Sequence, residues 1–165
     1  HANMWRISDD FWDNWPALFE QFDRLAKWSP HVGPGHWPDA DMLPLGVLGP
    51  RKSHFTPDEQ RTLMTLWSIA RSPLIHGGDM TQTDEETLRL LTNDEVIAVD
   101  QHSEDNRLLF DRDGLVAWTA RVPGSADLHL ALFNTRDRFP LDLSSPAFTS
   151  PLVTSSISLR LLRIV

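Results

Sequence analysis

Extended runs alternate with helical patterns three times within the first hundred residues, and this alternation limits the fold more than any other feature. The extended runs cover residues 3–8, 42–48 and 74–76, and a helical pattern follows each of them. Repeated units of this kind are typical of a parallel sheet with helices packed against it. The first part of the chain is therefore predicted to belong to the α/β class.

The segment after the first extended run predicts an amphipathic helix that ends near Trp28. Pro16 is compatible with its first turn, where no backbone N–H is needed, and Asp13 or Asn14 can cap it. The apolar residues recur at spacings of three and four and are Phe11, Trp15, Leu18, Phe22 and Leu25.

Capping signals predict the other helices. Residues 56–59 (TPDE) form a capping box with proline at the first helical position, for a helix that ends before Pro73. Residues 83–86 and 92–95 repeat the Thr-x-x-Glu pattern and predict two shorter helices that end near Asp100.

The pattern changes after His102, where short alternating strands replace the strand and helix units. Turns at Asp113-Gly114 and Pro123-Gly124 separate them, which is typical of an antiparallel sheet. We therefore predict two domains, residues 1–103 and residues 104–165. Residues 142–156 are rich in Ser, Thr and Pro and have no clear pattern, and residues 157–165 predict one strand. The earlier strands of the second domain are expected near residues 108–110, 115–122 and 128–133.

Composition excludes several classes of partner. Acidic residues outnumber basic ones 23 to 15, and no run of Lys or Arg could follow a nucleic-acid backbone. No apolar stretch approaches the roughly 20 residues that cross a bilayer, so no membrane partner is expected. The chain has no cysteine, and His1, His36, His76 and Asp79 lack the spacing of a metal site, so we expect neither metal nor cofactor.

Two acidic motifs are candidates for chemistry. Asp9 and Asp10 follow a strand, at the edge where α/β proteins build active sites, and alternation places Arg6 on the same face as Asp10. The simpler reading is that both carboxylates only favour the start of the next helix.

In the second motif, GPGHWPDADML (residues 33–43), carboxylates next to Trp37 suit a sugar, because hydroxyls bind carboxylates and a ring face packs on indole.

In order, spacing and residue type, these motifs resemble glycoside hydrolase family 27, the α-galactosidase and α-N-acetylgalactosaminidase family, over residues 3–103. The resemblance implies that Asp10, four residues after Arg6, is the general acid/base, and that Arg6 binds substrate hydroxyls. It also implies that Asp41 and Met42 line the sugar pocket, while Asp39 has a structural role. Residues 71–80 (RSPLIHGGDM) and 94–101 (DEVIAVDQ) look like the eighth strand and final helix of the family's barrel.

Three departures from the family pattern are visible. The position before the acid/base is usually small in the family but is Asp9 here, and His36 and Pro38 stand where Gly and Asn are common. These differences could retune the site or mark a different subgroup of the family.

The resemblance implies the C-terminal portion of a (β/α)8 barrel, about strands 6–8 with their helices, followed by the start of an antiparallel β-sandwich. A complete barrel takes about 250 residues. The family's nucleophile lies in a Lys-x-Asp segment on the fourth strand, and no such segment occurs here. We therefore interpret His1 as a cut edge or, as an alternative, a processing site, and expect the nucleophile upstream of it.

The expected function is part of a retaining glycosidase that hydrolyses terminal α-D-galactosides, a carbohydrate substrate, with the isolated chain inactive. α-N-acetylgalactosaminide, β-L-arabinopyranoside and isomalto-dextran specificities remain alternatives within the family. A non-catalytic sugar-binding barrel and a purely structural fragment are alternatives of other classes. For the full-length protein we favour a secreted or periplasmic location.

Overall fold

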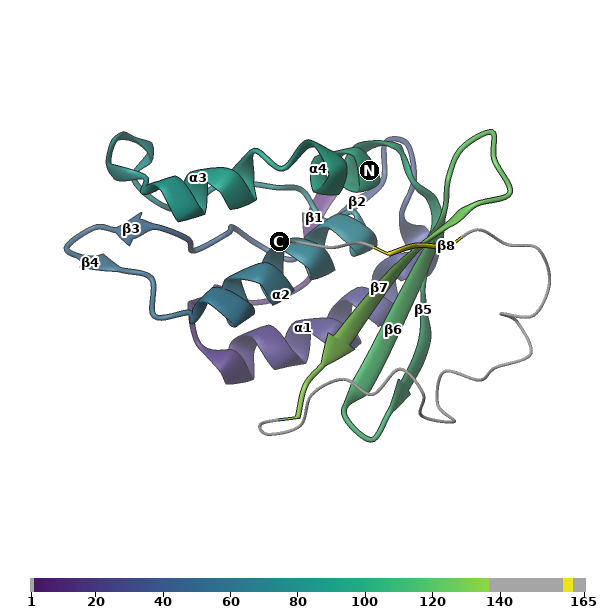
Figure 1. Ribbon diagram of the computed structural model, residues 1–165, viewed down its shortest axis with the longest axis horizontal. Coiled ribbons are helices and arrows are strands. Elements are labelled where there is room, and N and C mark those ends of the chain that lie inside the picture. Colours follow the sequence, from purple (N-terminus) through teal and green to yellow (C-terminus); the bar gives the residue numbers. More distant parts are fainter. Residues whose placement is uncertain (1, 137–158, 162–165) are drawn as a thin grey trace.

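The computed structural model of the chain describes residues 2–136 and 159–161 (Figure 1). Helices and short parallel strands form one part, and a four-stranded sheet forms the other. No helix among the described residues is long and apolar enough to cross a membrane.

Two short parallel strands start the fold. Strand β1 (Met4–Arg6) pairs with β2 (Trp37–Asp39) so that Met4 lies opposite Trp37 and Arg6 lies opposite Asp39. Strand β2 therefore lies within the GPGHWPDADML motif itself, before the extended run predicted over residues 42–48. The carboxyl ends of both strands lie side by side at Arg6 and Asp39.

The other two predicted extended runs are less regular. Leu43 and His76 form a single parallel bridge, with hydrogen bonds from Leu43 N to Ile75 O at 2.7 Å and from Gly77 N to Leu43 O at 2.9 Å. Further along, β3 (Val47–Leu48) and β4 (Arg51–Lys52) form a small antiparallel hairpin.

The two long helices begin where the sequence predicts. Helix α1 (Trp15–Trp28) is capped by Asn14, whose side chain accepts the N–H of Ala17 at 3.0 Å, so the cap is Asn14 and not Asp13. Helix α2 (Pro57–Ala70) has the predicted capping box, in which Thr56 accepts the N–H of Glu59 and the Glu59 carboxylate accepts the N–H of Thr56. A 3-10 turn, η1 (Ser29–His31), follows α1.

The predicted caps of the two short helices are wrong by one residue. Helix α3 (Glu85–Leu91) is capped by Asp84, and α4 (Asp94–His102) is capped by Asn93, because these side chains reach the N–H three residues ahead. Thr83 instead follows the 3-10 turn η2 (Met80–Gln82), and the Thr92 hydroxyl donates back to Leu88 O at 2.8 Å.

The predicted antiparallel sheet is present. Strands β5 (Glu104–Arg112), β6 (Leu115–Arg121) and β7 (Leu128–Asn134) pair antiparallel in chain order. Strand β8 (Leu159–Leu161) joins the edge of β7 in parallel, so the sheet is mixed and not purely antiparallel. The rest of the predicted strand over residues 157–165 and the segment 142–156 lie outside the described residues.

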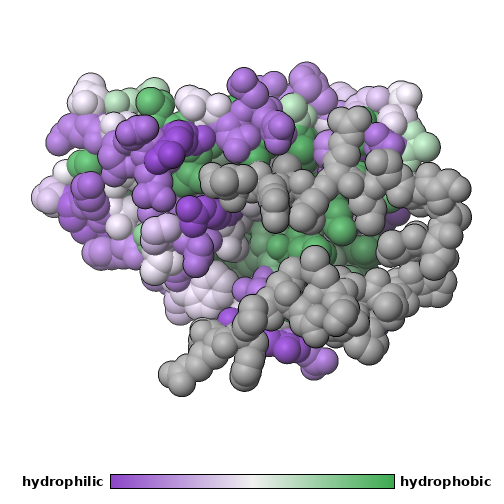
Figure 2. All heavy atoms as spheres, in the orientation of Figure 1, coloured by the Kyte–Doolittle hydropathy of each residue, from purple (hydrophilic) through white to green (hydrophobic). Residues whose placement is uncertain are grey.

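One hydrophobic core extends from the helices into the sheet. Phe22 of α1 packs edge-on against Phe133 of β7, with ring centroids 5.0 Å apart, and Trp67 of α2 and Trp118 of β6 are both fully buried. Figure 2 shows hydrophobic side chains gathered over β7, next to the helical part. Strand β5 begins at Glu104, four residues before the strand predicted near residues 108–110, and the division into domains 1–103 and 104–165 stays a prediction.

Arg71 connects the end of α2 to the end of α4. Its guanidinium donates to the carbonyls of Asp100, Gln101 and Ser103 at 2.7, 3.0 and 2.7 Å. The same guanidinium lies 4.8 Å from the ring centroid of Trp37, a favourable cation–π distance. Burial raises the pKa of Asp100 to about 7, although the nearby Arg71 charge opposes that rise.

We predict that Asp100→Asn weakens the pH dependence of folding. The folded pKa of about 7 exceeds the ordinary 3.8, so Asp100 favours folding below pH 3.8 and loses that contribution as the pH rises through 7. The variant should gain on the order of 1 to 3 kcal/mol over the parent at about pH 8 and little at about pH 4. Urea unfolding at both pH values measures this difference, and an equal gain at both would contradict the assigned cause.

Candidate active site

The Asp41 carboxylate collects hydrogen bonds at the carboxyl ends of β1 and β2. Its Oδ2 accepts from Arg6 Nη2 at 2.8 Å and from the N–H of Phe11 at 2.7 Å, and its Oδ1 accepts from the N–H of Met42 at 2.8 Å. The backbone N–H of Asp41 donates to Asp39 Oδ1 at 2.9 Å. These contacts hold Asp41 in its left-handed backbone conformation.

Arg6 brings the predicted acid/base residue next to Asp41. Besides its bond to Asp41, the guanidinium donates to the Asp9 carbonyl at 3.0 Å and lies 3.7 Å from Asp10 Oδ1. The Asp10 side chain is 85% exposed, whereas that of Asp41 is 14% exposed. The arrangement therefore has one fixed carboxylate, one open carboxylate and a cation between them.

Met42 contacts this cluster through its backbone N–H, and its side chain lies next to Gly77. A Cβ atom added at Gly77 would come within 2.5 Å of Met42 Sδ and 3.2 Å of the Leu43 carbonyl. Glycine at position 77 therefore leaves room for the Met42 side chain next to the Leu43–His76 bridge.

Buried aromatic side chains pack next to the cluster. Trp67 Nε1 donates to the Asp41 carbonyl at 2.9 Å, and Phe11 packs against Trp67 and Phe55 with ring centroids 5.1 and 6.1 Å apart. Phe11 and Trp67 are both fully buried. The cluster consequently rests on a packed core, which restricts its motion.

Trp37 does not join the other predicted site residues. It pairs with Met4 at the amino end of the strands, whereas Arg6, Asp10 and Asp41 gather at the carboxyl end. Its ring lies under the Arg71 guanidinium. The indole was expected next to a sugar because it is close to Asp41 in sequence. In the structure Trp37 lies at the amino end of β2, whereas Asp41 follows the carboxyl end.

Asp13 was considered only as a helix cap, and the structure gives it a different role. Its carboxylate is 2% exposed and accepts two hydrogen bonds from Arg51, at 2.6 and 2.8 Å, and one from the N–H of His54. Burial alone would raise the pKa of Asp13, but these hydrogen bonds outweigh it and lower the pKa. The ion pair between Asp13 and Arg51 fixes the segment between Asp10 and helix α1. Only the burial of Asp13, which the sequence does not show, reveals this role.

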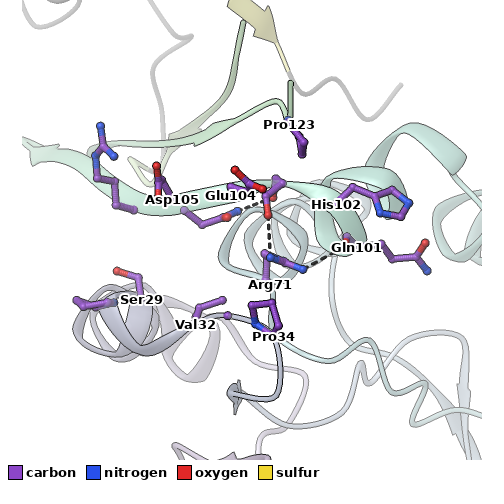
Figure 3. A pocket seen from close by; sticks show the side chains of 14 residues that line it. Ser29, Val32, Pro34, Arg71, Gln101, His102, Glu104, Asp105 and Pro123 are labelled. Atoms are coloured by element: carbon purple, nitrogen blue, oxygen red, sulfur yellow. Dashed lines mark hydrogen bonds between the residues drawn. The ribbon is translucent and has the colours of Figure 1, made fainter. Parts of the chain in front are cut away.

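A pocket of about 870 Å³ lies away from this cluster. Figure 3 shows Arg71 between residues 29–34 and the start of β5, with its hydrogen bonds dashed. The lining residues Gly33, Pro34 and Arg71 precede the parallel segments, so the pocket lies at their amino ends. In the described part of the chain no group of three or more His, Cys, Asp or Glu side chains could hold a metal ion.

Comparison with known proteins connects this geometry to a family. A family model described as alpha galactosidase A matches residues 1–102. An alpha-galactosidase from Oryza sativa subsp. japonica is 34% identical over 119 residues, which are 71% of this chain and 27% of the rice protein. Alpha-galactosidase 2 from Arabidopsis thaliana is 37% identical over 100 residues, which are 61% of this chain and 24% of that protein.

Solved structures agree with the sequence comparison. A GH27 β-L-arabinopyranosidase from Geobacillus stearothermophilus has a TM-score of 0.73 and 50% identity, over 74% of this chain and 30% of that one. A candidate α-N-acetylgalactosaminidase from Bacillus halodurans has a TM-score of 0.72 and 43% identity, over 79% and 32% of the two chains. The chain thus spans about a quarter to a third of the length of the relatives it matches.

Asp13→Ala should destabilise the fold by about 2 to 4 kcal/mol, because it removes a buried charge that three donors satisfy. The loss should shrink as the pH falls below 3.8, since the lowered pKa means that Asp13 favours folding only above that range. Urea unfolding measures both effects. Glu20→Gln is the matched control: Glu20 pairs with Arg24 but is 61% exposed, and its replacement should cost at most about 0.5 kcal/mol. Equal losses in the two variants would contradict the role of Asp13.

Proposed function

Because the chain belongs to the α-galactosidase family of glycoside hydrolases, family 27, we propose that it supplies the general acid/base and part of the sugar pocket of a retaining glycosidase. The observation that supports this most directly is the contact of Arg6 with both Asp10 and Asp41 at the carboxyl ends of two parallel strands. Active sites of (β/α)8 barrels are built at this end of the strands.

The proposed roles follow from how each carboxylate is engaged. Retaining hydrolysis needs one carboxyl group to attack the anomeric carbon and another, roughly 5 to 5.5 Å away, to protonate the leaving oxygen and then activate water. Asp10 is open enough to exchange protons with substrate and water. Asp41 has both oxygens occupied by donors, so it suits a fixed acceptor of sugar hydroxyls rather than the nucleophile. Arg6 and Met42 complete the proposed sugar contacts.

The nucleophile is proposed to come from outside these residues. In the family it lies in a Lys-x-Asp segment, and no Lys-x-Asp occurs among the 165 residues. The relatives are more than three times as long as the segment they share with this chain. In this proposal β1, β2 and residues 74–76 are strands 6–8 of a (β/α)8 barrel, with α1, α2 and α4 on its outside, and the later sheet begins a β-sandwich.

Two sugars are candidate substrates. Terminal α-D-galactosides are the first, since the curated relatives are named alpha-galactosidases. A β-L-arabinopyranoside is the second, because the solved GH27 β-L-arabinopyranosidase is 50% identical. The two sugars have the same ring stereochemistry and differ by the hydroxymethyl group that galactose carries on C5, so Arg6, Asp10 and Asp41 can serve either.

We predict that the intact protein carrying this chain hydrolyses an aryl α-D-galactopyranoside or an aryl β-L-arabinopyranoside, whereas the isolated 165-residue chain hydrolyses neither. Removing one of the two carboxyl groups should abolish the covalent step. Initial rates of nitrophenol release from both substrates measure this. Turnover by the isolated chain would contradict the proposed position of the nucleophile, and an intact protein without activity on either sugar would contradict the function.

Asp10→Asn in the intact protein should lower kcat/KM about 10² to 10⁴-fold for a methyl glycoside, which needs protonation of its leaving oxygen. A dinitrophenyl glycoside leaves without that help, so its loss should be about tenfold or less. The matched control is Asp9→Asn, since Asp9 is the adjacent exposed carboxylate and touches Arg6 only through its carbonyl. Its kcat/KM should change by about twofold or less for both substrates. A similar loss for both leaving groups would show that Asp10 is not the acid.

A further inference from the structure

We propose that Trp12 forms the leaving-group side of the pocket, where its indole binds the sugar or aromatic ring that hydrolysis releases. The proposal rests on the function proposed above, because it uses Asp10 as the residue that protonates the leaving oxygen. It adds a recognition residue for the part of the substrate beyond the scissile bond.

Trp12 is exposed, whereas its neighbour Phe11 is buried. Phe11 is 1% exposed and packs on Trp67, so its side chain points into the core. Asp10 and Trp12 flank Phe11, with the Asp10 side chain 85% exposed and Trp12 49% exposed. Since the Cα atoms of residues two apart are at most about 7 Å from each other, the two exposed side chains leave the backbone at neighbouring points.

The loop that carries Trp12 is held at several points. The N–H of Phe11 donates to Asp41 Oδ2 at 2.7 Å, and the N–H of Asn14 donates to the Trp12 carbonyl at 2.8 Å. Asp13, between these points, is buried and paired with Arg51. A fixed backbone presents the indole to solvent at low entropic cost, which favours binding of a ligand.

Ring packing among the described residues does not account for the position of the Trp12 indole. Phe19, on α1, is 48% exposed, but it packs against Trp15 and Phe22 with centroids 6.0 and 6.4 Å apart. Among the described residues Trp12 has no comparable ring contact. A large apolar ring beside a reactive carboxylate has an evident use in binding.

The chemistry determines which side of the substrate Trp12 meets. A general acid must touch the oxygen that leaves, so the leaving group lies beside Asp10, while Arg6 and Asp41 hold the sugar that reacts. The ring of a pyranose or an aryl group has an apolar face that packs on indole. We therefore assign the released ring, and not the reacting sugar, to Trp12.

The test compares two substrates with the same reacting sugar in the intact protein: a methyl glycoside and a disaccharide. Trp12→Ala should lower kcat/KM about tenfold for the disaccharide, the size of one aromatic packing contact, and about twofold or less for the methyl glycoside. Trp12→Phe keeps a ring and should stay within about threefold of the parent for both. Inhibition by the reacting sugar, added as the free monosaccharide, should be the same in all three proteins.

Phe19→Ala is the matched control, since it removes an equally exposed aromatic ring that lies on helix α1 and packs against Trp15 and Phe22. It should not change the ratio of the two kcat/KM values. Equal losses for both substrates in Trp12→Ala, or no loss for either, would overturn the assignment of Trp12. A parent protein that hydrolyses neither substrate would instead overturn the proposed function, so the two failures are distinguishable.

Discussion

The hydrogen bonds to the Asp41 carboxylate are the interaction on which the rest of the candidate site depends. They join Arg6 at the end of β1, the N–H of Phe11 in the next loop and the N–H of Met42 after β2. Because these donors come from three segments, one side chain fixes the position of all of them. Trp67 adds a hydrogen bond to the Asp41 carbonyl from the core of α2. The positive φ of Asp41 is therefore stabilised by its surroundings, as is common at functional sites.

The two ends of the parallel strands differ in the contacts that their side chains make. At the carboxyl ends, charged side chains meet at the surface, and the most exposed of them is Asp10. At the amino ends, Arg71 satisfies three carbonyls at the end of α4 and covers Trp37, which is a structural arrangement. The same division between a chemical end and a stability end is general in (β/α)8 barrels. The pocket beside Arg71 lies at the amino ends and is separate from the candidate site.

The loop between β1 and α1 combines rigidity with exposure. Phe11 and Asp13 point inward and hold it by packing and by an ion pair, while Asp10 and Trp12 point outward. Buried and exposed residues alternate over these four positions, so the loop is anchored to the core and still presents Asp10 and Trp12 to solvent. The 85% exposure of Asp10 also fits a chain that matches only a quarter to a third of its relatives, since the proposed second carboxylate belongs to the part that it does not match.

The sequence by itself determined the alternation of strands and helices, the capping box of α2, the three antiparallel strands and the pairing of Arg6 with Asp10. These features depend on local periodicity and on spacings of two to four residues, which a single sequence contains. Only the tertiary structure decided the position of Trp37 and the burial of Asp13. Trp37 is four residues from Asp41, but it lies at the amino end of β2 while Asp41 follows the carboxyl end, and Asp13 is paired with Arg51, far along the chain. Contacts between distant segments depend on how strands align and on what covers each side chain, and neither is encoded in local spacing.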